Sequence, residues 1–498
     1  MRFAVNVTDL APRGLDRVDK LSQDLHCVLD LQRRAALVEN PPAADIRIDR
    51  LARLMAAIGE NSDELVVALA EDFGQRNSVQ SFATDITAAL SALRHSQKRV
   101  RKWMKDGSSP AGHFLRAAGL KTRTIYQPLG VVGIISPWNF PVTLSVHPLG
   151  QAFAAGNRAM LKVSEVTGRT GNVLARVLSE YFEPSELAVI EGGPEVAAEF
   201  CRLPFDHIFF TGSTATGRRV MEAAAVNLVP VTLELGGQCP VVIDHDVDLK
   251  QVATALIFGK TLNAGQFCVA PDHAYVPENR RDRLVEALTA AAQQCFPNGM
   301  GDDATAVINQ DHFKRLCNHL SDARAKGAQV LELVSINDDG NRRLVPPTLV
   351  LNSDDTMSVC REELFGPILP IHTYSSIDDV IQRINARPRP LAAYYFGKDT
   401  HERERFLQRT VSGGVTLNDI LLHVGVESMP FGGVGASGTG KYHGRAGFET
   451  FSHAKSVVEG PRRPLTRFAR GPYSARSLRT LRWHASRSAA LALRKRSQ

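Results

Sequence analysis

The run His207-Ile208-Phe209-Phe210-Thr211-Gly212-Ser213-Thr214-Ala215 predicts an apolar strand, a glycine-containing turn and the start of a helix. The same succession repeats on both sides of this run. We expect strands at 130–135, 159–162, 187–190, 207–210 and 231–234, and helices from 142 and at 170–181, 195–202 and 215–225. Continuous apolar strands that alternate with helices are typical of a parallel, doubly wound α/β sheet, because helices bury both of its faces.

A second strand–helix series begins at Pro240-Val241-Val242-Ile243 and continues to about residue 420. One sheet would be oversized for both series, so the sequence predicts two α/β domains. We expect further strands at 122–126 and 450–458 that pair with one another. The first 34 residues show no clear periodicity, and we expect them to form a loosely held segment.

The composition is that of a globular protein with a large core, since 44% of the 498 residues are hydrophobic and 22% are charged. The seven cysteines show neither a Cys-x-x-Cys pair nor a Cys/His ligand spacing. We therefore expect no disulfide framework and no metal. Free thiols, the lack of a signal-peptide pattern and the lack of a membrane-spanning apolar run favour a cytoplasmic protein.

The positive charge is concentrated in a tail, residues 461–498. Eleven of the 59 basic residues lie there and no Asp or Glu follows Glu459, so the rest of the chain holds 48 basic against 52 acidic residues. This balance gives no reason to expect nucleic-acid binding by the body. Apolar tail residues recur at helical spacing: Leu478, Leu481, Ala485, Ala489 and Ala492. Two interpretations remain open, a basic amphipathic helix on an anionic membrane and a disordered solubilising tail.

Three loops carry residues suited to chemistry on a carbonyl carbon. Cys268 ends the run Asn263-Ala264-Gly265-Gln266-Phe267-Cys268, whose small and flexible residues leave the thiol accessible. Glu234 ends a predicted strand, where open α/β sheets place their ligands. Asn139 lies in a turn flanked by prolines. A thiol, a carboxylate and an amide supply a nucleophile, a base and an oxyanion donor. Taken singly, each of the three also fits a structural role. Cys268 fits core filling, Glu234 a helix cap or a solvated charge, and Asn139 a turn residue.

Two further loops suit a nucleotide. Gly212, Ser213, Thr214 and Gly217 follow an apolar strand and open a helix, so their backbone N–H groups and hydroxyls can meet a phosphate. Lys162 follows another strand and can hydrogen-bond ribose hydroxyls. The nearby Glu165 favours a ribose without a 2′-phosphate, and hence NAD over NADP.

The glycine-rich segment 429–444 formally matches two nucleotide motifs. Gly433-x-Gly435-x-x-Gly438 has the dinucleotide spacing, and Gly435-x-x-x-x-Gly440-Lys441 lacks only the Ser or Thr of a P-loop. Neither match follows a predicted strand or opens a helix, so we interpret the segment as a structural loop.

Together these features resemble the aldehyde dehydrogenase superfamily over about residues 35–460, and within it the class 3 branch and its coniferyl-type enzymes. The resemblance rests on five motifs in order: Pro137-Trp138-Asn139-Phe140-Pro141, Phe210-Thr211-Gly212-Ser213, Leu233-Glu234-Leu235-Gly236-Gly237, Gly265-Gln266-Phe267-Cys268 and Glu362-Glu363-Leu364-Phe365-Gly366-Pro367. The resemblance to the class 3 branch rests on three further runs, Cys268-Val269-Ala270-Pro271-Asp272-His273, Lys102-Trp103-Met104-Lys105 and Tyr442-His443-Gly444.

The resemblance implies a dinucleotide-binding domain at 35–118 and 129–234, a catalytic domain at 235–444, and oligomerisation strands at 119–128 and 445–460 of a homodimer. It implies that Cys268 is the nucleophile, Glu234 the general base, and Asn139 with the Cys268 backbone N–H the oxyanion hole. The cofactor, NAD with NADP also accepted, would lie against Trp138, Lys162, Glu165, Gly212, Ser213, Glu363 and Phe365. The loop at 430–440 becomes a wall of the active site, and the substrate is a hydrophobic aldehyde, phenylpropenal or aliphatic.

Two departures from the family pattern are local. Gln238 stands where the family usually has Lys, and Val163 replaces a usual Pro. Other functional classes remain to be weighed against the enzyme: a catalytically silent binding or structural protein on the same fold, and nucleic-acid binding through the tail.

Overall fold

The computed structural model describes residues 15–39, 41–107, 116–117, 119–337, 342–461 and 470–494. The chain divides into two compact units. The main unit comprises residues 1–104 and 127–453, and the small unit comprises residues 105–126 and 454–498. Every candidate catalytic and cofactor residue falls in the main unit.

The first sheet of the main unit has six strands in the order β14-β6-β5-β2-β3-β4. Its five longer strands are parallel neighbours, and only β14 runs antiparallel to β6. The bounds are β2 Val131–Ile135, β3 Arg158–Lys162, β4 Leu187–Ile190, β5 His207–Thr211, β6 Val231–Glu234 and β14 Gly438–Thr439. The five strands predicted for the first domain are confirmed.

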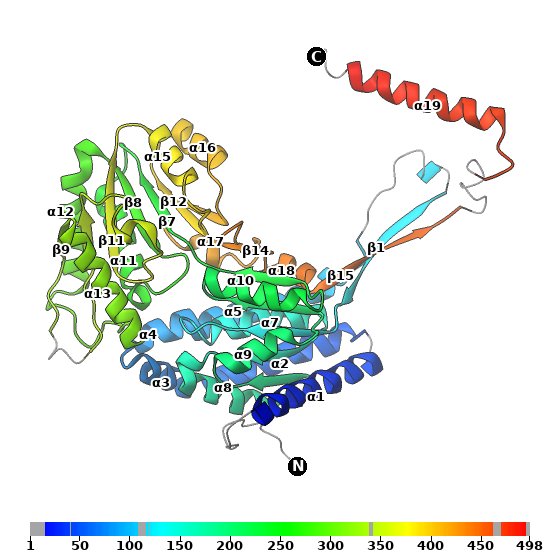
Figure 1. Cartoon of the computed structure of the whole chain (residues 1–498), viewed down its shortest axis with the longest axis horizontal. Helices are drawn as coiled ribbons and strands as arrows, with labels where there is room; N and C mark the ends of the chain where they lie inside the picture. The colour runs from blue at the N-terminus through cyan, green and yellow to red at the C-terminus, as the bar shows by residue number, and fades with distance from the viewer. Residues whose placement is uncertain are drawn as a thin grey trace. The chain divides into compact units, whose positions relative to one another are not determined.

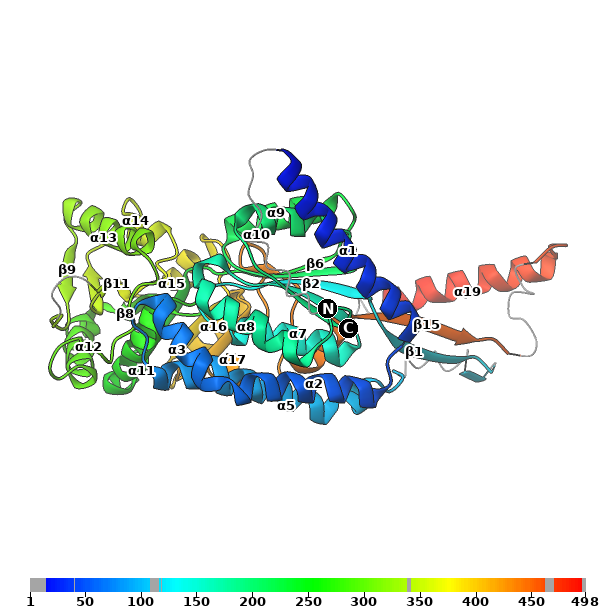
Figure 2. The same cartoon turned by 90° about the horizontal axis from the view of Figure 1, so that it is seen from below.

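Helices cover both faces of this sheet (Figures 1 and 2). On one face α7 packs against β2 and β3, with α2 and α5 outside it; on the other, α9 and α10 contact β2 and β5. Their bounds are α2 Ala44–Glu60, α3 Ser62–Phe73, α4 Ser78–Ser81, the π-helical turn η2 Phe82–Thr87, α5 Ala88–Trp103, α7 Thr143–Ala155, η3 Glu165–Thr167, α8 Gly168–Tyr181, α9 Pro194–Arg202 and α10 Thr214–Ala225. The predicted doubly wound arrangement is therefore correct.

The N-terminal segment differs from the expectation of loose packing. Helix α1 spans Leu15–Glu39 and contacts α9, β2 and β3. Leu25 and Leu29 are buried in the core of the first sheet, and the Gln32 side chain donates hydrogen bonds of 2.9 Å to the carbonyls of Ala159 and Pro184. Leucines four residues apart form its buried stripe, a signal that the many charged neighbours obscure in the sequence.

The second sheet has seven strands in the order β13-β12-β7-β8-β11-β10-β9, and only β9 is antiparallel to its neighbour. Its strands are β7 Cys239–Ile243, β8 Pro271–Pro277, β9 Gln329–Glu332, β10 Thr348–Leu351, β11 Ile368–Tyr374, β12 Ala392–Phe396 and β13 Gly414–Leu417. The accompanying helices are α11 Leu249–Thr261, η4 Leu262–Gly265, η5 Glu278–Arg280, α12 Arg281–Cys295, α13 Gln310–Ala325, α14 Ser358–Arg361, α15 Ile377–Asn385, α16 Thr400–Arg409 and α17 Leu422–Gly425. The second predicted α/β domain is present.

Two elements near the end of the main unit lie differently from what the predicted ranges suggest. Strand β14 lies inside the range 235–444 but pairs with β6 of the first sheet, because the glycine at 438 lets its backbone approach the Leu233 carbonyl of β6 closely. Residues Gly444–Thr450 form helix α18, which packs on α7 and α5 with Phe448 buried. The last strand therefore begins at Ser452 and not at 445.

A two-stranded sheet of β1 Lys121–Pro128 and β15 Ser452–Glu459 lies mostly in the small unit and confirms the predicted pairing. Helix α19 spans Ala475–Arg494 and follows the helical spacing of the tail. Its described side chains are exposed or half-exposed, among them Leu478, Leu481 and Trp483. Within the described ranges no helix has both the length and the apolar character to cross a membrane.

Candidate active site

A cavity of about 1100 Å³ opens in the main unit where β2, β3, β5 and β6 end. Eleven of the twelve predicted site residues line it: Cys268, Glu234, Asn139, Trp138, Lys162, Glu165, Gly212, Ser213, Thr214, Glu363 and Phe365. Gly217 does not. It is buried within α10, where a β-carbon would come 2.7 Å from the Leu235 side chain, so its small size serves helix packing.

Glu234 is the last residue of β6 and is 2% exposed. Neither of its carboxylate oxygens has a hydrogen-bond partner among the described residues. Burial alone raises its pKa well above the usual value, so the carboxyl group keeps its proton to a higher pH than an exposed glutamate does. The glycine-rich loop closes over it, since a β-carbon at Gly432 would lie 3.1 Å from Glu234 Oε1. The interpretation of that loop as a wall of this site fits the geometry.

Cys268 follows a backbone turn that few sequences can adopt. Asn263, Ala264 and Gly265 have positive φ angles of 47°, 53° and 69° in succession. The Cys268 side chain stays partly accessible at the end of this turn. Burial, followed by the nearby carboxylates of Glu363 and Glu234, raises the thiol pKa to about 12. The thiol is therefore protonated at neutral pH and needs a proton acceptor before it can attack a substrate.

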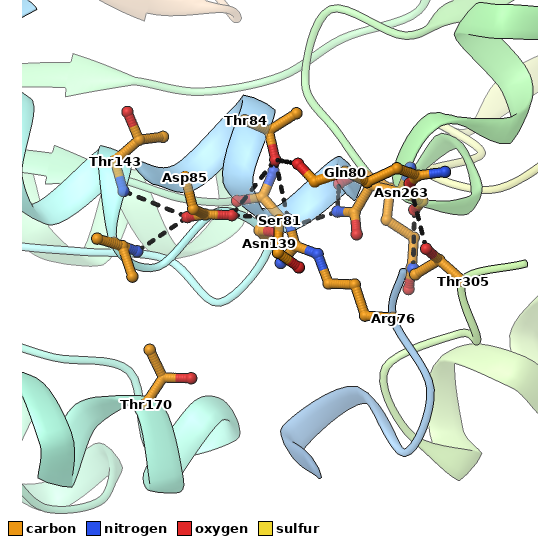
Figure 3. Close-up of polar contacts among 12 residues, drawn as sticks. Arg76, Gln80, Ser81, Thr84, Asp85, Asn139, Thr143, Thr170, Asn263 and Thr305 are labelled. Atoms are coloured by element: carbon orange, nitrogen blue, oxygen red, sulfur yellow. Dashed lines mark hydrogen bonds and ion pairs between the residues drawn. The ribbon is translucent and has the colours of Figure 1, made fainter. Parts of the chain in front are cut away.

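Asn139 lies between β2 and α7 and is 4% exposed. Its carbonyl oxygen accepts hydrogen bonds from Arg76 Nη1 at 3.3 Å and from Asn263 Nδ2 at 3.0 Å (Figure 3). Its side-chain amide lines the cavity and bonds to no other described residue. The backbone is thus fixed while the amide stays available to a ligand.

The nucleotide side of the cavity has a lysine held close to a glutamate. Lys162 Nζ donates 2.6 Å to the Val163 carbonyl and lies 3.4 Å from Glu165 Oε2. Burial lowers the pKa of Lys162, while Glu165 is 43% exposed and keeps the ammonium paired. At the start of α10, the Ser213 hydroxyl accepts from the Thr216 N–H at 3.2 Å. That hydroxyl therefore caps the helix as an acceptor, and its own hydrogen can still be donated to a phosphate.

Glu363 and two aromatic rings form the opposite wall. Burial raises the pKa of Glu363 to about 8, and its Oε1 has no described hydrogen-bond partner. A β-carbon at Gly236 would lie 2.3 Å from that oxygen, so the glycine is required for the close approach. The Trp138 ring packs edge-on to Phe365, with centroids 5.4 Å apart.

The cavity fits a dinucleotide. Its volume exceeds that of most small-ligand pockets, which measure about 300–1,000 Å³. Buried polar atoms in its walls lack partners, namely Ser136 Oγ, Thr211 Oγ1 and Glu363 Oε1. Such atoms are costly to leave unbonded, and a ligand rich in hydroxyl and phosphate groups would satisfy them.

Several functional-site residues escaped the sequence analysis. His312 and Arg315 of α13 also line the cavity, and the His312 ring lies 5.0 Å from that of Trp138. No motif marks them, because α13 reaches the site only through the fold. Gln238, which stands where the family usually has Lys, makes hydrogen bonds of its own in the structure. Its amide donates to the carbonyls of Cys360 and Glu362 at 3.1 and 3.2 Å, next to Glu363.

One group with metal-ligand chemistry lies outside the residues that line the cavity. His147 Nε2 is 3.2 Å from Glu427 Oε2, and the ligand-type atoms of His147, Glu427 and His443 spread over up to 4.8 Å. Zinc bonds of about 2.0–2.1 Å require ligand atoms roughly 3.3 Å apart. We therefore describe this group as a histidine–carboxylate pair beside a second imidazole.

Comparisons with known proteins agree with this site. The aldehyde dehydrogenase family model matches residues 39–457. Coniferyl aldehyde dehydrogenase of Pseudomonas sp. (strain HR199 / DSM 7063) is 44% identical over 92% of this chain and 96% of its own length. Aldehyde dehydrogenase family 3 member B1 of Rattus norvegicus is 37% identical over 88% of this chain and 92% of its own.

A solved structure of Mycobacterium tuberculosis aldehyde dehydrogenase complexed with NAD+ superposes with a TM-score of 0.78, at 28% identity, over 89% of this chain and 92% of that one. The family match covers most of the chain, and the fold and the cavity agree with it. The chain therefore belongs to the aldehyde dehydrogenase family and is an NAD(P)-dependent enzyme of that family.

Proposed function

We propose that the protein oxidises a hydrophobic aldehyde to its carboxylic acid through a thioester on Cys268. The observation that carries this proposal is the meeting of Cys268, Glu234 and Asn139 in one cavity with the nucleotide-binding residues. Thiol, carboxylate and amide are the groups that acyl transfer through a covalent intermediate requires.

In the proposed reaction the Cys268 thiol first gives up its proton to solvent, and the thiolate then attacks the aldehyde carbon. The Asn139 amide and the Cys268 backbone N–H stabilise the oxyanion, and one such donor is typically worth about 10²–10³ in rate. A dinucleotide held against Trp138, Lys162 and Phe365 would supply the hydride acceptor for this oxidation. Glu234, once ionised, removes a proton from the water that attacks the thioester, which releases the acid and the thiol.

We propose NAD as the preferred cofactor, with NADP accepted more weakly. Lys162 would bond the adenosine ribose hydroxyls. Glu165 would repel a 2′-phosphate, because its carboxylate lines the cavity beside Lys162.

For the substrate, we propose a phenylpropenal such as coniferyl aldehyde, with a medium-to-long aliphatic aldehyde as the alternative. The support is the 44% identity to a protein named coniferyl aldehyde dehydrogenase, whose length the match covers almost completely. The test is kcat/KM for coniferyl aldehyde, benzaldehyde and hexanal with NAD, followed at 340 nm. A preference for hexanal of tenfold or more would contradict the aromatic assignment.

We also propose a homodimer built on the small unit. Two-stranded sheets are marginal by themselves, and most side chains of β1 and β15 are exposed or half-exposed in the single chain. A second copy would cover them by adding to an open edge. In analytical ultracentrifugation, Val458→Asp should shift the protein towards monomer, whereas Val226→Asp, at an even more exposed valine of the main unit, should not. Monomeric wild type at micromolar concentration would refute the dimer.

We further propose a cytoplasmic enzyme that binds anionic membrane surfaces through α19. The support is the set of exposed apolar side chains Leu478, Leu481 and Trp483 on a helix whose charged residues are all basic.

A further inference from the structure

A fully buried ion pair lies behind the oxyanion site, and neither of its partners carries a known role. Arg76 Nη2 donates to Asp85 Oδ2 at 2.6 Å, and both side chains are 0% exposed. Burying two charges costs several kcal/mol per ion unless further hydrogen bonds compensate. Asp85 also lies in the π-helical turn η2, a backbone irregularity that occurs often at functional sites. A pair that is this costly to bury is expected to have a role that offsets the cost.

The pair holds both ends of the turn that carries Asn139 (Figure 3). Arg76 Nη1 donates to the Asn139 carbonyl at 3.3 Å, and Asp85 Oδ1 accepts from the backbone N–H groups of Val142 and Thr143 at 3.0 and 3.2 Å. The rings of Phe73 and Phe140 lie 4.8 and 5.3 Å from the guanidinium carbon. One ion pair thus fixes the backbone before and after Phe140-Pro141.

The same helical segment holds the loop of the nucleophile. Asn263 Nδ2 donates to the Asn139 carbonyl at 3.0 Å, so this oxygen is bonded from two sides. The backbone N–H of Asn263, at φ +47°, donates to Gln80 Oε1 at 3.0 Å, and the Thr305 hydroxyl donates to the same oxygen at 3.2 Å. A non-glycine residue in the left-handed region persists only where its surroundings fix it.

We propose that Arg76, Gln80 and Asp85 are positioning residues that hold the two halves of the oxyanion hole, the Asn139 amide and the Cys268 backbone N–H, at a fixed separation. None of the three lines the cavity, so they act through the Asn139 carbonyl and Asn263. The proposal rests on the proposed function. Oxyanion donors act only within about 2.7–3.1 Å of the developing charge, and a displacement of about 1 Å can cost 10²-fold in rate.

The first test is Arg76→Lys, which keeps the charge but loses the planar fork that bonds Asp85 and Asn139 together. Two reactions are followed: NAD-dependent aldehyde oxidation and cofactor-free hydrolysis of p-nitrophenyl acetate. In the second, the Cys268 thiolate displaces nitrophenolate to form an acetyl thioester, which water then hydrolyses. We expect kcat to fall about 10–100-fold in both reactions, while the Kd for NAD changes less than twofold. Rates are divided by the nitrophenolate burst, which counts functional thiols.

The control is Arg50→Lys. Arg50 is 1% exposed and pairs with Glu39 and Glu186 at 2.8 and 2.9 Å, without a bond to either catalytic loop. It should lower Tm as much as Arg76→Lys does but leave kcat per functional thiol unchanged. If Arg76→Lys fails to fold, Gln80→Leu removes the bonds of the Gln80 amide oxygen to the Asn263 N–H and the Thr305 hydroxyl and should lower kcat in both reactions about tenfold.

The decisive measurement is a double-mutant cycle with Asn139→Ala. If Arg76 acts through Asn139, Arg76→Lys should change kcat less than threefold once the amide is gone. If Arg76→Lys lowers kcat equally in the wild-type and the Asn139→Ala proteins, the positioning role is overturned. Unchanged kcat for both Arg76→Lys and Gln80→Leu would overturn it too. A wild-type protein that gives neither NADH nor a nitrophenolate burst would instead refute the proposed function itself.

Discussion

Lys162 Nζ lies 3.4 Å from Glu165 Oε2 at the edge of the cavity, and only the glutamate is open to solvent. Glu165→Gln should raise the NADP/NAD ratio of kcat/KM about tenfold, because it removes the charge that would repel a 2′-phosphate. Glu222→Gln, an equal charge change at an exposed residue of α10 outside the cavity lining, should leave the ratio unchanged. An unaltered ratio in Glu165→Gln would mean that this carboxylate does not face the ribose.

Cys268→Ala should reduce aldehyde oxidation at least a thousandfold while the protein still binds NAD. The thiol is the nucleophile in the proposed reaction, and it lies near Glu234, whereas Cys201, another cysteine of the cavity lining, lies near Lys162. Oxidation is measured by NADH absorbance and binding by calorimetry. The control is Cys317→Ala, at an exposed cysteine of α13. Residual turnover above about a thousandth of wild type would indicate a different nucleophile.

Glu234→Gln should slow release of the acid more than hydride transfer. Stopped-flow traces should show a burst of NADH followed by a steady rate at least a hundredfold below wild type. Burial raises the pKa of Glu234, so the wild-type carboxyl group loses its proton only as pH rises through that raised value. Its deacylation rate should therefore increase with pH, and the Gln variant should lack this increase. Loss of both burst and steady state would assign Glu234 to activation of the thiol.

The sequence predicted the five parallel strands of the first sheet, and in the second sheet the strand at 240–243, because each is a short apolar run between turn residues, and parallel strands buried on both faces read that way. Helix α1 was missed because Leu25 and Leu29 stand among charged residues. Strand β14 was missed because it consists of Gly438 and Thr439, which carry no strand signal. Its pairing depends on close backbone approach, which only the folded chain reveals.

The residues of the candidate site likewise comprise some that the sequence identified and some that it did not. Cys268, Glu234 and Asn139 lie in motifs whose residue types already suggest chemistry. Arg76 and Asp85 do not, because an arginine and an aspartate nine residues apart normally read as solvated charges. Their burial follows from the packing of α3 and η2 beneath the Asn139 turn, a long-range contact that no local pattern encodes.

Gly236→Ala should impair cofactor binding more than folding. The added β-carbon would lie 2.3 Å from Glu363 Oε1, so the carboxylate must move out of its place in the cavity wall. We expect KM for NAD to rise at least tenfold with a Tm within a few degrees of wild type. Gly168→Ala on α8 provides the matched control, since a β-carbon there meets no atom within 4 Å. Equal KM values in both variants would remove Glu363 from the proposed cofactor site.

A 1–460 truncation should keep full aldehyde dehydrogenase activity and lose binding to acidic vesicles. Each basic residue near an anionic bilayer contributes on the order of 1 kcal/mol, so the eleven in the tail suffice without deep insertion. Sedimentation with phosphatidylserine vesicles should decrease in high salt, and neutral phosphatidylcholine vesicles should bind little.

Two full-length variants separate the contributions of α19. Replacing Arg476, Arg479 and Arg482 by Glu removes the charge attraction, whereas replacing Leu478, Leu481 and Trp483 by Ser removes the exposed apolar side chains. An amphipathic helix at the surface requires both sets, so each variant should bind acidic vesicles less than wild type. If only the Arg variant loses binding, the tail acts as a charged chain without insertion. Equal sedimentation of full-length and truncated protein would reject a membrane role and leave the assignment of the enzyme unaffected.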